Sequence, residues 1–256
     1  MKAGLPRILL YDIETAPPIV AAWERYETNV LWEERPGYML CYAYKWLGEA
    51  RTHVVGLPDF KTYKRYPHDD KLLVQSLYEL FSEADIIIAH NGDSFDQRTA
   101  KARFLKYNLG PPAPFKQIDT LKVSRKHFRL PSHKLDDLAQ YLGVKRKIRT
   151  GGIDLWYDVT HGDMKAWSKM MRYNQQDVRV LEDVYLKLRP WMSGHPGLNL
   201  YGQPHKCPYC GSGPLQYRGF RLTKTLRYHR LQCQNCGGWS SERESDKTFV
   251  KPVLVS

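Results

Sequence analysis

A short apolar run near the N-terminus carries two carboxylates, and this pairing limits how the chain can fold. The run is Leu9-Leu10-Tyr11-Asp12-Ile13-Glu14-Thr15. Its apolar and β-branched residues predict a strand, in which successive side chains alternate between two faces. Asp12 and Glu14 therefore share one face, and Tyr11 and Ile13 share the other. Because neighbouring like charges repel, the strand either exposes both acids to water or holds a cation between them.

The order of the expected elements predicts an α/β domain. We expect strands over residues 8–14, 38–46, 51–57, 85–90 and 115–121, and helices over 69–83, 95–107, 134–142 and 164–188. Residues 20–35 are expected to be irregular. Three strands followed by alternating helices and strands favour a mixed sheet with helices on both sides. The last helical pattern stops at Pro190, so we place this domain at 1–190 and a linker at 191–203.

A second acidic segment follows a strand that is expected to be buried. It reads His90-Asn91-Gly92-Asp93-Ser94-Phe95-Asp96, directly after Ile86-Ile87-Ile88-Ala89. Ligand sites of open α/β sheets lie at strand ends of this kind. Asp96 could instead serve the helix itself, since an acid in a first helical turn complements the helix dipole. Asp93 is the alternative carboxylate, although its place in the turn is more typical of a helix cap.

The third acidic segment lies in the long C-terminal helix. Tyr173 and Asp177 are four residues apart and therefore share a helical face. Met170 and Val180 belong to the apolar face of the same helix, so Asp177 is expected at or beside a buried seam, where a carboxylate needs a partner. The alternative is an exposed acid on a solvated helix.

These three segments, in this order, resemble the three exonuclease motifs of the DnaQ-like superfamily. That superfamily comprises ribonuclease H-like 3′-to-5′ exonucleases named for their Asp-Glu-Asp-Asp residues. The Tyr-x-x-x-Asp form of the third segment resembles the tyrosine-bearing branch (DEDDy), which includes the proofreading domains of family A and family B DNA polymerases. The resemblance covers about residues 7–189.

The resemblance implies a role for each motif residue. Asp12, Glu14, Asp96 and Asp177 would hold two divalent cations, Mg²⁺ or Mn²⁺, because carboxylate oxygens suit hard ions. One cation would activate a water, and the other would stabilise the leaving 3′ oxygen. Tyr173 would orient that water, since a tyrosine pKa near ~10 makes it a poor base at neutral pH. The expected products are nucleoside monophosphates released from a 3′ end.

Four of the five cysteines form two close pairs near the C-terminus. The pairs are Cys207-Pro208-Tyr209-Cys210 and Cys233-Gln234-Asn235-Cys236. Four thiolates so arranged favour one structural Zn²⁺. With strands expected over 215–220 and 226–232, residues 204–256 resemble a zinc ribbon, and a redox dithiol is the alternative. Cys41 lies in an apolar run and is expected to be a small buried side chain.

The charge of the chain favours a nucleic-acid partner. The formal net charge is +12, from 39 Lys and Arg against 27 Asp and Glu, and such an excess attracts polyanions. The side chains expected to contact a strand are Thr15, Asn91, Lys145, Arg146, Lys147, Arg149, Arg218, Arg221, Lys224, Arg227 and Arg230. Aromatic residues interleave with the last five, as in single-strand binders. Two alternatives for these rings are a small core of the ribbon and a surface for protein docking.

The resemblance, together with the basic charge, implies a magnesium- or manganese-dependent 3′-to-5′ exonuclease, and we expect it to act on single-stranded DNA in replication or repair. No polymerase sequence follows, so we expect a free-standing enzyme or one supplied to a polymerase or other replication protein. An RNA exonuclease and a non-catalytic nucleic-acid-binding or adaptor protein are the alternatives. No apolar run approaches the ~20 residues of a membrane span, and no signal peptide is apparent. We therefore expect a cytoplasmic protein of a bacterial or phage-infected host cell, with no membrane partner.

Overall fold

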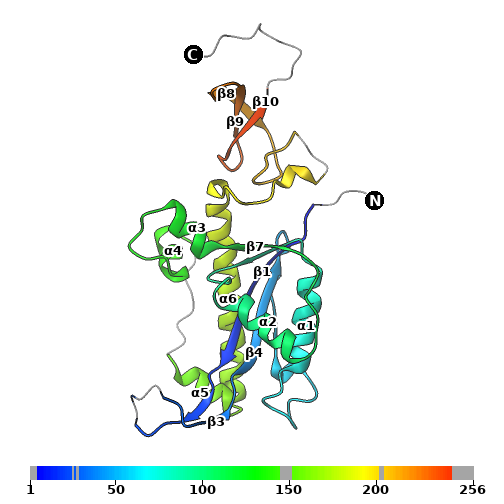
Figure 1. Ribbon diagram of the computed structural model, residues 1–256, viewed down its shortest axis with the longest axis vertical. Coiled ribbons are helices and arrows are strands. Elements are labelled where there is room, and N and C mark those ends of the chain that lie inside the picture. Colours follow the sequence, from blue (N-terminus) through cyan, green and yellow to red (C-terminus); the bar gives the residue numbers. More distant parts are fainter. Residues whose placement is uncertain (1–4, 25, 27–28, 145–151, 202–204, 244–256) are drawn as a thin grey trace. The chain divides into compact units, whose positions relative to one another are not determined.

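The computed structural model describes residues 5–24, 26, 29–144, 152–201 and 205–243 (Figure 1). The chain divides into two compact units, one over Arg7–Tyr185 and another that contains the chain from Leu186 onward. The domain boundaries taken from the sequence remain predictions. No helix within the described ranges is long and apolar enough to cross a membrane.

A mixed five-stranded sheet organises the first unit. Its strands are β1 (Ile8–Ala16), β4 (Tyr38–Trp46), β5 (His53–Gly56), β6 (Ile86–Ala89) and β7 (Lys116–Asp119). They lie in the order β5-β4-β1-β6-β7. β1 pairs with β4 antiparallel and with β6 parallel. All four residues of β6 are buried, as its uninterrupted apolar sequence predicts for a central strand.

Helices cover both faces of this sheet, which confirms the predicted fold class. The helices are α1 (Lys71–Ser82), α2 (Asp96–Lys106), α3 (Thr120–His127), α4 (Leu135–Tyr141), α5 (Asp154–Thr160) and α6 (Met164–Leu188). On one face Tyr11 of β1 packs edge-on against Phe81 of α1, with ring centroids 4.9 Å apart. On the other face Asn174 of α6 hydrogen-bonds Asp12. The alternation of β1 thus places Tyr11 on the α1 side of the sheet and Asp12 on the α6 side.

The buried carboxylate of Asp70 links α1 to β4 and α2. Asp70, at the start of α1, is fully buried and accepts a hydrogen bond from the Met39 backbone N–H of β4 at 2.8 Å. Its other oxygen accepts from Arg103 of α2 and from the Tyr107 hydroxyl, each at 2.5 Å. A buried charge is tolerated when it is paired and hydrogen-bonded in this way. Asp70 therefore fixes α2 against β4.

The sequence predictions failed at three places in this unit. Residues 20–35, which we expected to be irregular, overlap the hairpin strands β2 (Ile19–Ala21) and β3 (Trp32–Arg35). The strand expected over 115–121 ends at Asp119, because the Asp119 side chain accepts from Leu121 N–H and Lys122 N–H and starts α3. Helix α5 was not expected either.

The second unit contains a small antiparallel sheet. Its strands are β8 (Leu215–Leu222), β9 (Arg227–Cys233) and β10 (Trp239–Arg243), in the order β10-β9-β8. Two short 3₁₀ helices, η2 (Arg189–Trp191) and η3 (Leu198–Leu200), precede this sheet. A third, η1 (Leu57–Asp59), follows β5 in the first unit. Two strands were expected in the second unit, and its third strand, β10, was not.

Candidate active site

Three carboxylates from the two ends of the first unit's sequence converge. Asp12 and Glu14 of β1 and Asp177 of α6 each offer an oxygen, and these oxygens lie within 4.8 Å of one another. Asp177 is buried, whereas Asp12 and Glu14 are partly exposed. The two strand acids share a face through the period of two, and α6 supplies the third from across the face of the sheet.

Asp96 lies against the same segment of β1 but plays a different structural part. It is the first residue of α2 and is buried. Its Oδ1 accepts a hydrogen bond from the Ile13 backbone N–H at 3.0 Å, between Asp12 and Glu14 in sequence. Asp93, the alternative carboxylate, instead pairs with Lys122 at 2.6 Å. The structure therefore brings Asp96 beside the strand acids and holds Asp93 on a surface lysine.

The Tyr173 hydroxyl remains protonated in this setting. Burial, followed by the charges of Asp177 and Glu14, raises the pKa of Tyr173 above its ordinary value. The Tyr173 ring also meets Trp156 of α5 edge-on, with centroids 6.3 Å apart. A phenol with a raised pKa is a hydrogen-bond donor and a poor proton acceptor.

Sequence reasoning missed Asn174, which orients Asp12. Asn174 is fully buried, and its Nδ2 donates to Asp12 Oδ2 at 2.7 Å and to the Asp12 carbonyl at 3.3 Å. Its Oδ1 accepts from the Cys41 thiol at 3.7 Å. Burial and the nearby Glu14 charge raise the pKa of Cys41, so the thiol keeps its proton. The spacing of three between Asn174 and Asp177 places both on one helical face and was the available signal.

Asp119 is a second missed residue, and it fastens the loop that leads to Asp96. It is buried, and besides capping α3 it accepts from Asn91 N–H at 2.9 Å and from Asp93 N–H at 3.3 Å. Asn91 has φ +64°, a conformation that asparagine tolerates better than most residues. At Gly92 a Cβ atom would approach the Ala89 Cβ to 2.4 Å, so only glycine fits the turn.

The residues predicted to contact nucleic acid fall into three groups. Thr15 follows Glu14 in β1, and Asn91 lies in the β6–α2 loop, where its N–H donates to Asp119. Lys145, Arg146, Lys147 and Arg149 lie outside the described residues. Arg218, Arg221, Lys224, Arg227 and Arg230 are all exposed on the C-terminal unit.

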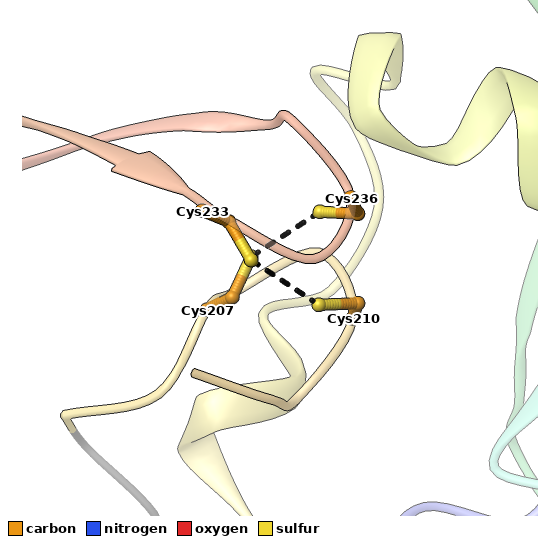
Figure 2. A group of neighbouring side chains, drawn as sticks. All are labelled: Cys207, Cys210, Cys233 and Cys236. Atoms are coloured by element: carbon orange, nitrogen blue, oxygen red, sulfur yellow. Dashed lines mark hydrogen bonds between the residues drawn. The ribbon is translucent and has the colours of Figure 1, made fainter. Parts of the chain in front are cut away.

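The four paired cysteines gather at one point in the second unit (Figure 2). All four sulfur atoms lie within 4.8 Å of one another, with Cys207 to Cys236 and Cys210 to Cys233 at 3.7 Å. Both Cys-x-x-Cys segments fold alike, since Gly211 N–H donates to the Cys207 carbonyl and Gly237 N–H donates to the Cys233 carbonyl. The glycines have φ +70° and +72°, a conformation that glycine adopts at no steric cost.

Ionisation of one thiol is favoured in this cluster. Burial opposes the charge on Cys210, but hydrogen bonds from Ser212 and from neighbouring groups outweigh it and lower the pKa of Cys210 to about 6. The Ser212 hydroxyl lies 3.0 Å from the Cys210 sulfur. A thiolate is the form that binds a metal ion, so the donor set fits a tetrahedral zinc site.

A mixed sheet with acids gathered on one face is the arrangement of a ribonuclease H-like domain. The RNase H superfamily profile matches residues 47–189, more than half of the chain, and the chain belongs to that superfamily. The matched segment contains Asp96 and Asp177 and begins after β1. This membership supports a nuclease.

One solved structure with a similar fold is the family B DNA polymerase from the hyperthermophilic archaeon Pyrobaculum calidifontis. The TM-score is 0.53 with 20% identity, over 73% of this chain and 25% of the polymerase chain. The chain therefore spans about a quarter of that polymerase, and the likeness is one of fold. A search of the curated proteins found no relative of significant similarity.

Proposed function

We propose that this protein is a metal-dependent 3′-to-5′ exonuclease acting on single-stranded DNA. The observation that carries the proposal is the convergence of Asp12, Glu14 and Asp177 within 4.8 Å. Three carboxylates this close repel one another unless cations or protons offset their charge. An all-oxygen donor set suits Mg²⁺ or Mn²⁺.

We assign two divalent cations to this cluster, with Asp96 as the fourth carboxylate. Cations there would lower the pKa of an attacking water and stabilise the leaving 3′ oxygen. Asn174 donates a hydrogen bond to one oxygen of Asp12 at 2.7 Å, which orients this carboxylate within the cluster. The protonated Tyr173 hydroxyl orients the water or a phosphate oxygen by donating a hydrogen bond. Products are nucleoside monophosphates.

We further assign one structural Zn²⁺ to Cys207, Cys210, Cys233 and Cys236, which makes the second unit a zinc ribbon. The four sulfurs and the matched turns around them support zinc over a redox dithiol. So small a sheet buries little apolar surface, and a metal offsets that deficit.

The substrate and setting are also proposals. The net charge of +12 supports a nucleic-acid partner. The similar solved structure is a DNA polymerase, which is our reason for choosing DNA over RNA and for naming a polymerase or another replication protein as a partner. We place the protein in the cytoplasm of a bacterial or phage-infected host cell.

A strand-shortening assay tests the activity. Single-stranded DNA and RNA of one sequence, each labelled at the 5′ end, are incubated with Mg²⁺ or Mn²⁺. We expect a ladder that shortens from the 3′ end, strongest for DNA and abolished in Asp12→Asn with Glu14→Gln. Immediate release of a labelled mononucleotide would show the opposite polarity. Intact strands with folded protein would favour the non-catalytic binding or adaptor function.

The role of Asp96 is tested by a matched pair of substitutions. Asp96→Asn keeps an oxygen that can accept from Ile13 N–H but removes the charge. Asp93→Asn removes the charge that pairs with Lys122. Loss of cleavage in the first variant alone assigns Asp96 as the fourth carboxylate, and loss in the second alone assigns Asp93.

A further inference from the structure

The two faces of the β8–β9–β10 sheet differ in what their side chains contact. Cross-strand pairs place Phe220 opposite His229, and the two rings lie 5.0 Å apart. Tyr217 meets the same His229 ring edge-on at 5.3 Å, and the Arg227 guanidinium covers Phe220 at 4.5 Å. Tyr217 also donates from its hydroxyl to Glu242 at 3.4 Å. The rings of this face therefore pack against one another in a small cluster at the surface of the sheet.

The opposite face presents a groove whose lining includes the ring of Trp239. In the strand register, Trp239 pairs with Gln232 and Ser241 pairs with Arg230, so Trp239 and Arg230 project to the same side. The groove, called here the Trp239 groove, has a volume of about 370 Å³ and is lined by Arg221, Arg230, Trp239, Ser240 and Ser241. The Trp239 side chain is 47% exposed. A volume of this size lies in the range of about 300–1,000 Å³ that is usual for ligand sites.

The Trp239 groove is positively charged and partly preorganised. Its lining residues include two guanidinium groups and no acid. Arg230 Nε donates to the Arg218 carbonyl at 3.1 Å, which anchors its guanidinium 5.7 Å from the centre of the Trp239 ring. Because Arg230 is already held, binding an anion costs less side-chain entropy than it would for a free arginine.

We propose that the Trp239 groove is a binding site for single-stranded nucleic acid, with one base stacked on Trp239 and the adjacent phosphates on Arg221 and Arg230. Stacking on an aromatic ring next to paired cations is the chemistry by which proteins hold single strands without reading sequence. The site goes beyond the proposed exonuclease because it uses no residue of the carboxylate cluster and needs no 3′ end.

The test uses a circularised thymidine oligonucleotide, which has no 3′ end to cleave. Binding of the full chain, loaded with zinc, is followed by fluorescence anisotropy over a series of salt concentrations. We expect Trp239→Ala to weaken binding about 5- to 100-fold, since stacking contributes strongly to single-strand affinity. Trp239→Phe should restore most of the loss. Log affinity falls as log salt rises, and Arg221→Gln should make this slope shallower by about 0.7, the value for one lost phosphate contact on a single strand.

Tyr217→Ala is the matched control, because it removes an exposed ring from the opposite face of the same sheet. It should leave binding unchanged, and zinc content and circular dichroism should match the parent protein in every variant. Two results would overturn the proposal. The first is unchanged binding by Trp239→Ala and Arg221→Gln, which would leave the groove to an acidic protein surface. The second is an equal loss in Tyr217→Ala. Neither depends on whether the protein cleaves linear DNA.

Discussion

A neutral neighbour, Asn174, helps to orient Asp12. Asn174 donates to Asp12 and accepts from the Cys41 thiol, so both ends of its amide are fixed. A carboxylate among other carboxylates has several orientations of similar energy, and a buried donor selects one of them.

Removal of this donor should therefore weaken metal binding. We expect Asn174→Ala to lower cleavage about 10- to 100-fold, with a higher Mg²⁺ concentration needed for half-maximal rate. A magnesium titration of the rate measures both. Gln175→Ala, which removes a hydrogen bond to the Thr52 carbonyl, is the neighbouring control and should behave as the parent. Equal Mg²⁺ requirements in all three proteins would contradict this role.

The pH dependence of cleavage should identify how Tyr173 acts. Its pKa is raised by burial and by Asp177, so the hydroxyl stays protonated at every pH below the ordinary value of ~10. Tyr173→Phe should then lose about 10- to 100-fold, the effect of one hydrogen bond to a charged group, by the same factor across the range. Rate profiles of both proteins supply the test. A loss confined to alkaline pH would indicate that tyrosinate, not tyrosine, is the active form.

At the scale of elements, the β6–α2 loop depends on a side chain from β7. Asp119 ends β7, caps α3 and accepts from Asn91 N–H and Asp93 N–H. One residue thus sets the end of a strand, the start of a helix and the course of the loop before Asp96.

A pair of capping substitutions separates these roles. Asp119→Ala should lower the free energy of unfolding by about 2–3 kcal/mol, from the lost cap and the lost loop hydrogen bonds, and should also reduce cleavage. Asp163→Ala removes a carboxylate that accepts from Lys165 N–H and Ala166 N–H at the start of α6, and should cost about 1 kcal/mol with cleavage unchanged. Urea unfolding and the strand assay measure both effects. Equal stability losses would mean that the loop does not rely on Asp119.

At the scale of the molecule, the two compact units should respond differently to loss of the proposed zinc ion. A zinc-selective chelator should unfold the β8–β9–β10 sheet, because its cysteine cluster replaces much of a hydrophobic core. The sheet of the first unit has its own buried core and should persist. Limited proteolysis is expected to release a stable N-terminal fragment and to degrade the remainder, and Cys207→Ser should reproduce this pattern without chelator. Protection of the C-terminal strands after zinc removal would refute the structural role of the metal.

Local periodicity in the sequence was sufficient to predict several features of this protein. The period of two in β1 placed Asp12 and Glu14 on one face, and the uninterrupted apolar run of β6 marked a central strand. The paired cysteines indicated a common cluster because their spacing is chemically specific. The β2–β3 hairpin and α3 were harder to predict. The start of α3 depends on hydrogen bonds made by one side chain, that of Asp119.

Tertiary packing was needed to establish which distant side chains meet. Asp12 and Asn174 are 162 positions apart, and no local pattern reports that β1 and α6 bring them together. The β8–β9–β10 sheet gives a second example. Its aromatic and basic residues interleave in the sequence, and the strand register decides which of them pack with His229 and which line the Trp239 groove. The physical reason is that periodicity fixes the face on which a side chain lies, whereas packing fixes what that face meets.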